Sequence, residues 1–244
     1  WSSDVCSSDL RATSASATTG EAAVVALAGG ALGWLGGAWL HPWVGTVMAV
    51  VGATNGGLAG ARGIYDWRRR AGWVAFVLDS TWAALPVAVS LPTHLVGWRT
   101  FVQAMSRRRG YFVYSGGFTF KPGFALTVGN VISGAGDVSR SRRAKLIDEH
   151  EAVHVWQARW FGPLYLPLYG AWAGLGALVG LVLWVLRGRT QPRNSIVESC
   201  SYYMNPFEWW AYSRDDLWPP PGLHETVGWK RPAVRSFASR RNQG

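Results

Sequence analysis

Hydrophobic residues in this chain gather into long runs instead of alternating regularly with polar residues. Residues 22–40 and 43–61 are two such runs without a charged side chain, and His41 and Pro42 separate them. A helix of about 19 residues is about 28 Å long, close to the apolar thickness of a bilayer. The pattern therefore predicts two membrane helices, joined as a hairpin within residues 22–67.

Both runs carry small residues at four-residue spacing, which places these residues on one face of each helix. They are Gly29, Gly33 and Gly37 in the first run and Gly52, Gly56 and Gly60 in the second. Such a stripe lets two helix backbones approach closely in lipid. The pair resembles the glycine-zipper hairpins of bacterial membrane proteins. It predicts a packed structural hairpin, through which copies of the chain could also associate as a homo-oligomer.

Residues 68–110 form a third apolar region, which Asp79 and Pro86 interrupt. Arginine runs at residues 68–70 and 107–109 flank it. By the positive-inside rule both flanks belong on the cytoplasmic side, which disfavours a single crossing. The pattern predicts interfacial or re-entrant helices, with Asp79 facing water. The alternative for an acidic residue in such a segment is a functional role inside the membrane.

From residue 111 the sequence changes to the pattern of short strands. Residues 111–132 are rich in aromatic and β-branched residues and contain Gly-Gly and Pro-Gly pairs, so two or three strands with tight turns are expected. A helix is expected to begin near Ala144 and to end at Gly162-Pro163. Another apolar run follows at residues 164–186. The predicted fold class is therefore α+β, with helical membrane segments around a small core of strands and helices.

Composition agrees with a membrane protein. The net charge is +10, yet 49% of the residues are hydrophobic and 16 are Trp, a residue that favours the membrane interface. Lys and Arg stand in short clusters between apolar runs, as at residues 140–145 and 187–193. This arrangement suits anionic lipid headgroups better than a phosphodiester backbone. We therefore expect a lipid bilayer as a partner, no nucleic acid, and a location in a bacterial cytoplasmic membrane.

Two end segments carry little fold information. Residues 1–10 do not continue into the alanine-rich sequence after them and resemble translated sequencing-adapter sequence, so they enter no fold prediction. Residues 217–244 are basic and turn-rich and predict a disordered tail. Once Cys6 is set aside, Cys200 stands alone, which argues against a disulfide framework and favours a buried small residue.

The motif with catalytic potential is H-E-x-x-H, within residues 148–157, in a chain that has 5 His. On a helix, His150 and His154 project from one face and can share one tetrahedral Zn²⁺. Glu151 lies beside them, where it could take a proton from metal-bound water without ligating the metal. The alternative is a degenerate site whose histidines are solvated or hydrogen-bonded helix residues.

This helix and the segment before it resemble the zincin metallopeptidases, in particular small bacterial peptidase-like domains. Their helix reads H-E-x-x-H-x-x-Q and follows a T-x-G-x-x-I strand. The matching positions are Thr127, Gly129 and Ile132 in the strand and His150, Glu151, His154 and Gln157 in the helix. The resemblance implies a zinc cofactor, Gln157 beside the metal ligands, and a strand edge on which an extended peptide docks. It covers about residues 111–162 and a second patch at residues 205–216.

A catalytic zinc site needs a third protein ligand and one open position. Glu208 is the expected ligand, because Asn205-Pro206 is a good helix opening and the related domains carry a Glu in a similar setting. Asp215 shares the helical face of Glu208 and could brace a histidine. Glu198 is the reserve ligand. The alternative role for Glu208 is to stabilise the N-terminus of its helix.

The apolar run at residues 164–186 separates the two halves of this site. As one helix across the bilayer it would carry Glu208 about 34 Å away from His150. Two arrangements avoid the conflict. The run folds back at Gly174 or Gly176 as a re-entrant hairpin, or the helix of His150 itself lies at membrane depth, as in intramembrane metalloproteases. Basic clusters at both ends of the run favour the fold-back.

The sequence thus predicts a membrane-embedded zinc metallopeptidase-like hydrolase. Residues 111–216 are its metal-site domain, and residues 164–186 are an apolar membrane insertion within that domain. In the expected mechanism Zn²⁺ polarises the scissile carbonyl of a peptide or protein substrate, and Glu151 deprotonates the bound water and later protonates the leaving amine. The rival hypothesis is a non-catalytic membrane scaffold that oligomerises through its glycine-zipper hairpin and has a structural or lost metal site.

Overall fold

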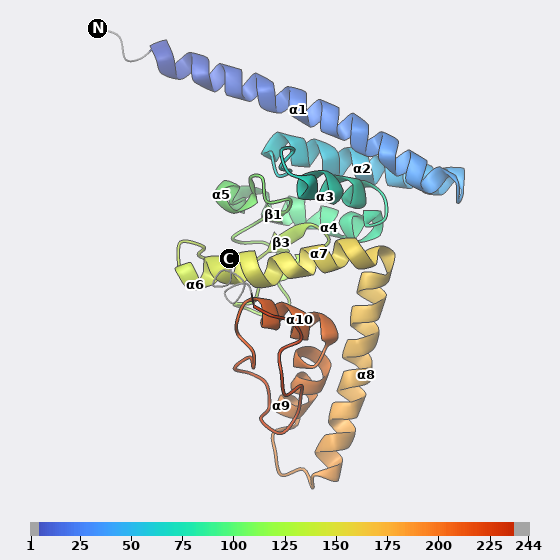
Figure 1. Cartoon of the computed structure of the whole chain (residues 1–244), viewed down its shortest axis with the longest axis vertical. Coiled ribbons are helices and arrows are strands. Elements are labelled where there is room, and N and C mark those ends of the chain that lie inside the picture. The colour runs from blue at the N-terminus through green and yellow to red at the C-terminus, as the bar shows by residue number, and fades with distance from the viewer. Residues whose placement is uncertain (1–4, 237–244) are drawn as a thin grey trace. The chain divides into compact units, whose positions relative to one another are not determined.

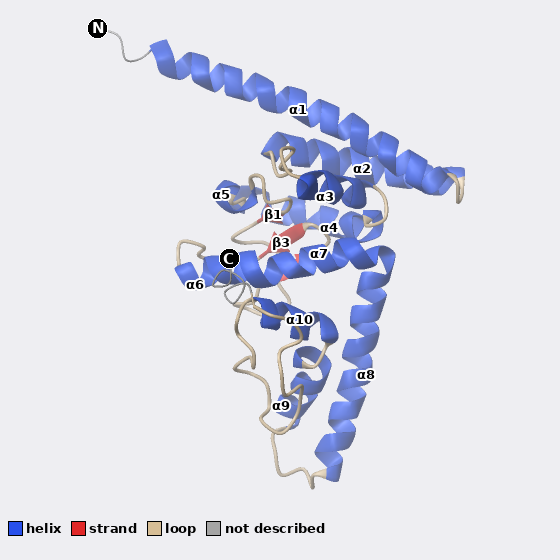
Figure 2. Ribbon diagram, viewed as in Figure 1, coloured by secondary structure: helices blue, strands red, loops and turns tan. Residues whose placement is uncertain are grey.

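The computed structural model describes residues 5–236, with side chains from residue 19 onward, and divides into two compact units. Unit 1 takes the described residues up to Asp137 together with Ala158–Pro163; unit 2 takes Val138–Gln157 and the described residues from Leu164. Helices dominate, with one small mixed sheet (Figure 2), so the predicted α+β class is confirmed. The adapter origin of residues 1–10 stays a prediction, and residues 1–4 lie outside the described part.

The elements are labelled in Figure 1. Unit 1 contains helices α1 (Val5–Ala38), α2 (Pro42–Arg62), α3 (Arg70–Ser80), α4 (Ala84–Gly97) and α5 (Gln103–Ser106), the 3₁₀ turn η1 (Trp98–Thr100), and strands β1 (Phe112–Val113), β2 (Leu126–Val128) and β3 (Val131–Ser133). Unit 2 contains α6 (Ser141–Lys145), the π-helix η2 (Leu146–Glu151), α8 (Tyr165–Leu186), α9 (Arg193–Glu198), the π-helix η4 (Ser199–Tyr203) and α10 (Pro206–Arg214). Helix α7 (Ala152–Phe161) and the 3₁₀ turn η3 (Gly162–Leu164) contain residues of both units.

Helices α1 and α2 pack with their small-residue faces in contact. A Cβ atom at Gly29 would overlap the Gly52 carbonyl, and one at Gly56 would overlap the Val25 carbonyl. Similar overlaps would arise at Gly33, Gly37 and Gly60. Side chains larger than hydrogen would force the two backbones apart, so these stripes are the contact between the helices. Because both stripes are used within one chain, association of copies through them would require the hairpin to open.

Three helical segments are long and apolar enough to cross a membrane: Thr19–Ala38, Pro42–Arg62 and Ser141–Leu186. Helices α3 and α4 pass the same test only as a pair, and they meet at a bend of 89°. Such a bend is what a broken span or a re-entrant loop would show. These segments are compatible with the expected membrane location.

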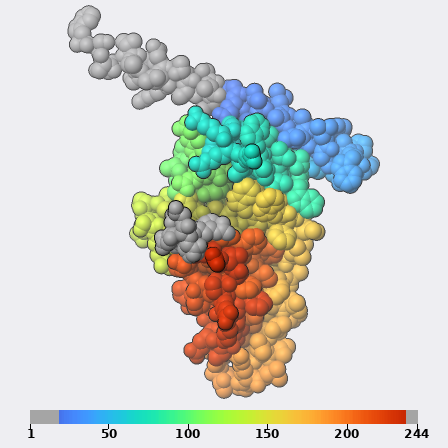
Figure 3. Space-filling view, viewed as in Figure 1, coloured from blue at the N-terminus to red at the C-terminus, as the bar shows by residue number. Residues whose placement is uncertain are grey.

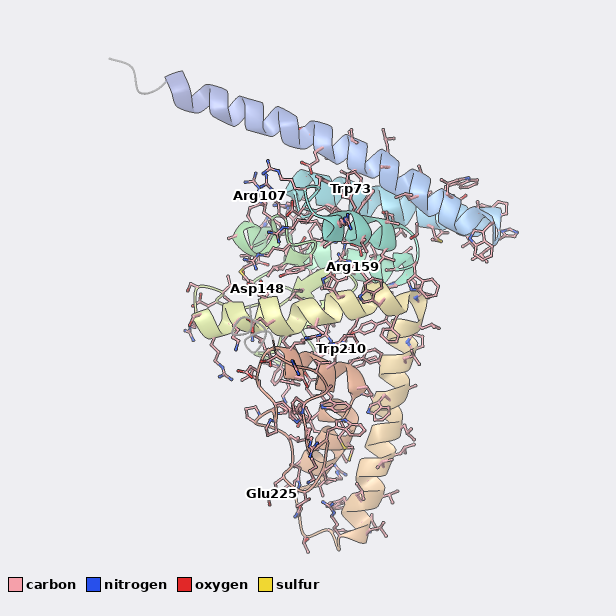
Figure 4. The ribbon with its side chains drawn as sticks, viewed as in Figure 1. Trp73, Arg107, Asp148, Arg159, Trp210 and Glu225 are labelled. Atoms are coloured by element: carbon pink, nitrogen blue, oxygen red, sulfur yellow. The ribbon has the colours of Figure 1, made fainter. Side chains whose placement is uncertain are left out.

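Asp79, at the end of α3, was predicted to face water, but it is buried. It is 1% exposed, and the Nε and Nη2 atoms of Arg159 (labelled in Figure 4) donate to its two oxygens at 2.8 Å each. Tyr65 and Asn130 donate to the same carboxylate at 2.8 and 3.1 Å. The prediction was wrong because the partner that makes burial of this charge tolerable lies 80 positions away in the chain, beyond any local pattern.

The strands form one sheet in the order β1-β3-β2, in which β1 is parallel and β2 antiparallel to β3. The segment that was predicted as one strand is a hairpin: Thr127 in β2 pairs with Ile132 in β3, and Gly129-Asn130 is the loop. Gly129 has φ +55°, and a Cβ there would also overlap the Pro86 backbone, so the position requires glycine. Thr127 lies on an edge strand, whereas Ile132 is buried in the central one.

The apolar run at residues 164–186 does not fold back at Gly174 or Gly176. Residues Tyr165–Leu186 are one helix, α8, and the chain turns only after it, at residues 187–192 (Figure 1). The following residues 193–203, which form α9 and η4, return along α8 and are called the return arm below. Figure 3 shows the atoms of the return arm and the residues after it, in orange and red, packed against α8.

Two glycines of α8 make this packing possible. A Cβ at Gly176 would overlap the Cys200 carbonyl, and one at Gly180 would lie 2.8 Å from the Cα of Val197. Glycine marks turns and close helix contacts alike, and here it marks a helix contact. The fold-back prediction was therefore wrong about the place of the turn. The return arm nevertheless brings the chain back toward the start of α8. Cys200 is buried in this contact, as predicted.

Replacing Gly176 with Ala should destabilise unit 2 by about 1–3 kcal/mol, because the added methyl group would push the return arm away from α8. Gly174 is the matched control on the same helix, since a Cβ there meets nothing within 4 Å. Gly174→Ala should be neutral or slightly stabilising, because Ala is the better helix former. Thermal unfolding of the detergent-purified variants, followed by tryptophan fluorescence, would compare them. Equal melting temperatures would contradict the contact.

Residues 217–236 contain no helix or strand, yet they pack on unit 2. Val227 is buried in a small apolar core, and the Trp229 ring stacks on Trp209 with ring centroids 4.5 Å apart. The prediction of a disordered tail was therefore wrong for these residues, because basic composition does not reveal the aromatic partners that order them. Residues 237–244 of the predicted tail lie outside the described part.

Candidate metal centre

His150 and His154 lie where the π-helix η2 passes into helix α7. A π-turn within a helix frequently occurs at a functional site. The two rings face the same point: their centroids are 5.0 Å apart and their Nε2 atoms are 3.3 Å apart. Both residues are buried, with 2% and 5% of their surface exposed. The sequence spacing of four residues thus produces the shared face that was expected.

Glu208 reaches the same point from α10. Asn205 caps this helix by accepting a backbone hydrogen bond of 3.1 Å, and Pro206 follows it, as the sequence predicted. Glu208 Oε1 lies 3.3 Å from His154 Nε2, and Glu208 Oε2 lies 3.5 Å from His150 Nε2. One ligand atom from each of the three residues lies within 4.8 Å of the others, so the group could hold a metal ion.

Hydrogen bonds on the far side of each imidazole determine which nitrogen carries a proton. His150 Nδ1 lies 3.1 Å from Asp215 Oδ2, and a carboxylate only accepts, so Nδ1 is the donor. His154 Nδ1 lies 2.8 Å from Gln157 Oε1. The Gln157 amide is oriented by its Nε2 atom, which donates to a backbone carbonyl of α10 at 3.0 Å, so His154 Nδ1 is also a donor. In the neutral imidazoles both Nε2 lone pairs then face inward.

Two inward lone pairs and a carboxylate repel one another unless a cation lies among them. Burial alone would raise the pKa of the Glu208 carboxyl, but positive charge beside it at His154 and His150 outweighs burial and holds this pKa below its usual range. The Glu208 Oε2 atom is buried and has no hydrogen-bond partner. An unpaired buried oxygen is costly, and a bound cation would satisfy it. The donor set and this oxygen therefore fit a metal ion.

Tyr169 belongs to the site but was not predicted. From α8 its hydroxyl donates to Glu208 Oε1 at 2.7 Å, which holds one carboxylate oxygen and leaves Oε2 toward His150. Tyr212 of α10 packs edge-on against the His150 ring, with ring centroids 4.4 Å apart. A signal was available in the sequence: Tyr165 and Tyr169 stand four residues apart in an apolar run, and a buried phenol hydroxyl usually requires a partner.

Removing the Tyr169 hydroxyl should weaken metal binding about 10–100-fold, the usual effect of losing a hydrogen bond that orients a ligand. Tyr169→Phe keeps the ring and frees Glu208 to rotate. Competition with a chromophoric chelator would measure the affinity. Tyr165→Phe is the control, because the Tyr165 hydroxyl lies 3.4 Å from His154 Nδ1, whose hydrogen is already donated to Gln157. Equal affinity in Tyr169→Phe and wild-type protein would refute the orienting role.

The two remaining carboxylates of the predicted site differ in position. Glu151 is next to His150 in the chain, is 7% exposed, and interacts electrostatically with both histidines. Glu198 lies half-buried in α9 and does not belong to the three-residue group. Its assignment as a reserve ligand therefore has no support, because the carboxylate beside the histidines comes from α10 and not from the return arm.

The predicted substrate-edge residues Thr127, Gly129 and Ile132 lie in unit 1, whereas the three-residue metal group belongs entirely to unit 2. Their role in substrate docking stays a prediction.

Comparisons of the chain with protein-family models, with curated proteins and with solved structures found no match. The resemblance to zincins consequently depends on the motif residues and on the geometry of the metal group.

Proposed function

We propose that this protein is a membrane-embedded, zinc-dependent hydrolase that cleaves peptide bonds. The observation that carries the proposal is the spacing of the donor atoms. The Nε2 atoms of His150 and His154 are 3.3 Å apart, Glu208 Oε1 lies 3.3 Å from His154 Nε2, and Glu208 Oε2 lies 3.5 Å from His150 Nε2. Zinc bonds of about 2.0–2.1 Å in a tetrahedron separate neighbouring ligand atoms by about 3.3–3.4 Å. The donor set also favours zinc, since Mg²⁺ and Ca²⁺ prefer oxygen ligands and water to two imidazoles.

The number of donors supports a catalytic site over a structural one. Among the described residues, the group contains His150, His154 and Glu208 and no fourth His, Cys, Asp or Glu. Structural zinc sites are usually closed by four protein ligands, whereas catalytic sites keep one position for water or substrate. The scaffold hypothesis with a structural zinc would require the fourth ligand.

The residues around the group suit hydrolysis of an amide. Zinc, when bound, supplies a Lewis acid that polarises the scissile carbonyl and makes water more acidic. Glu151 would accept the proton of the attacking water and deliver it to the leaving amine. Asp215 and Gln157 would hold the two imidazoles with Nε2 unprotonated, and Tyr169 would hold the Glu208 carboxylate.

The segment that carries the two histidines supports the membrane-embedded part of the proposal. Both lie within Ser141–Leu186, one of the three segments that are apolar and long enough to cross a membrane. We infer that the substrate is a peptide segment presented at or near the bilayer.

Peptide hydrolysis by detergent-purified protein tests this proposal. A library of quenched fluorescent peptides, with apolar members included, should be cleaved; a chelator should stop the cleavage, and about one equivalent of Zn²⁺ should restore it. Mg²⁺ should not. Zinc-loaded protein that cleaves nothing in the library, in detergent and in lipid nanodiscs, would instead favour the non-catalytic scaffold.

A further inference from the structure

Exposed arginines from two distant segments of unit 1 lie at the same end of helix α2. The first segment contributes Arg68, Arg69 and Arg70 and the second Arg107, Arg108 and Arg109, and together they are called the arginine patch below. Backbone hydrogen bonds join the second segment to the residues that follow α2, a few positions before Arg68: the Arg108 N–H donates to Gly63 O at 2.9 Å, and the Gly110 N–H donates to Ile64 O at 2.7 Å. The fold thus combines two clusters that the sequence shows only separately.

The arginine patch lies at one end of the α1–α2 hairpin. Helix α2 ends and helix α3 begins beside it, at Arg62 and Arg70. The start of the apolar part of α1 is at the same end, because Gly60 packs against Ala22. The opposite end of the hairpin carries exposed tryptophans, Trp39 and Trp43. A 21-residue helix such as α2 is about 32 Å long, close to the apolar thickness of a bilayer.

Tryptophans also border the arginine patch itself. Trp73 on α3 and Trp98 after α4 are 54% and 50% exposed. The Arg62 guanidinium lies 4.8 Å from the Trp98 ring. Figure 4 labels Trp73 and Arg107, the first on α3 and the second just after α5. Exposed tryptophan beside clustered arginine, at the end of an apolar hairpin, is the composition of a surface at the level of lipid headgroups.

We propose that the arginine patch binds the phosphate groups of anionic phospholipids and so anchors this end of the hairpin at the membrane surface. A guanidinium can donate two parallel hydrogen bonds to one phosphate, which suits a headgroup better than a point charge would. Within the arginine patch, Arg69 pairs with Asp66 at 3.3 Å. A lipid suits this position better than a nucleic acid does, because apolar helices continue directly from the arginine patch. The inference is independent of the proposed hydrolase activity.

Titration of the full chain in neutral detergent micelles with fluorescent phosphatidylglycerol tests the proposal. Replacing Arg68 and Arg107 together with Gln should weaken binding about 30-fold, from about fivefold for each arginine near a membrane surface. Lys230→Gln with Arg231→Gln is the matched control: it removes the same charge from two exposed positions of unit 2 outside the basic clusters and should change the affinity less than about threefold. Replacing Arg68 and Arg107 with Lys, which keeps the charge but loses the paired donors, should weaken binding less than the Gln replacement does.

Three further ligands test whether the arginine patch prefers an anionic phospholipid to a neutral lipid, to free phosphate and to a nucleic acid. Phosphatidylcholine should bind the wild-type chain much more weakly, and neither inorganic phosphate nor a single-stranded oligonucleotide should displace phosphatidylglycerol at equal concentration. If the double Gln variant does not fold, single replacements of Arg68 and Arg107 carry the test, each with about a fivefold loss. Equal binding of both phospholipids, equal losses in the patch and control variants, or displacement by the oligonucleotide would overturn the proposal.

Discussion

Replacement of His154 with Ala should lower the zinc content of the purified chain from about one ion to a level near zero. Two donors, His150 and Glu208, would remain, and the loss of a direct ligand should cost more than the about 10–100-fold that loss of a supporting hydrogen bond costs. Elemental analysis after gel filtration in metal-free buffer measures the content. His224→Ala is the control, because His224 belongs to unit 2 but lies outside the three-residue group.

This experiment separates a metal site from a cluster of protonated histidines. If the histidines are imidazolium groups paired with Glu208 and Asp215, neither wild-type nor variant protein should retain zinc at this stoichiometry. Equal zinc in the wild-type, His154→Ala and His150→Ala proteins would show that the ion binds elsewhere and would remove the site from consideration.

Replacement of Glu151 with Gln should leave the zinc content unchanged and reduce peptide hydrolysis about 10²–10⁴-fold. Gln keeps the size of the side chain and its ability to form hydrogen bonds but cannot accept the proton of the attacking water. Glu149→Gln is the control: it removes the same charge two positions earlier, from a residue that pairs with Lys145 at 3.7 Å. The rate constants should be compared at saturating zinc.

The outcome identifies the role of this carboxylate. Glu151→Gln protein with zinc and with wild-type activity would exclude Glu151 as the base. A loss of zinc together with activity would mean that Glu151 contributes to holding the metal. A similar loss of activity in Glu149→Gln would point to a general effect of charge on this helix.

The grouping of His150, His154 and Glu208 could be predicted in part from local helical geometry. His150 and His154 face one point because they are one turn apart, and Glu208 follows a recognisable helix start at Asn205-Pro206. Asp215 lies 3.1 Å from His150 Nδ1, where a shared helical face with Glu208 placed it. The spacing within each helix extends over a few residues and can be recognised in the sequence. The assignment of Glu208 and Asp215 to the same site as His150, which is 65 positions from Asp215, also depended on the resemblance to the zincins.

The parts that were missed depend on contacts between distant segments. Burial of Asp79 can be explained only by its contact with Arg159. The role of Tyr169 can be recognised only from its hydrogen bond to Glu208 of α10. The glycines of α8 are ambiguous for a different reason. Gly176 could serve a turn or a close helix contact, and only the position of the return arm decides between the two.

The central claim is that one zinc ion binds to His150, His154 and Glu208 with one position left open. Diffraction data collected on either side of the zinc absorption edge test it most directly. The predicted result is a single anomalous peak about 2.0–2.1 Å from both Nε2 atoms and from a Glu208 oxygen, with no fourth protein ligand. Absence of a peak between these three side chains, or a fourth protein ligand at the ion, would contradict the claim.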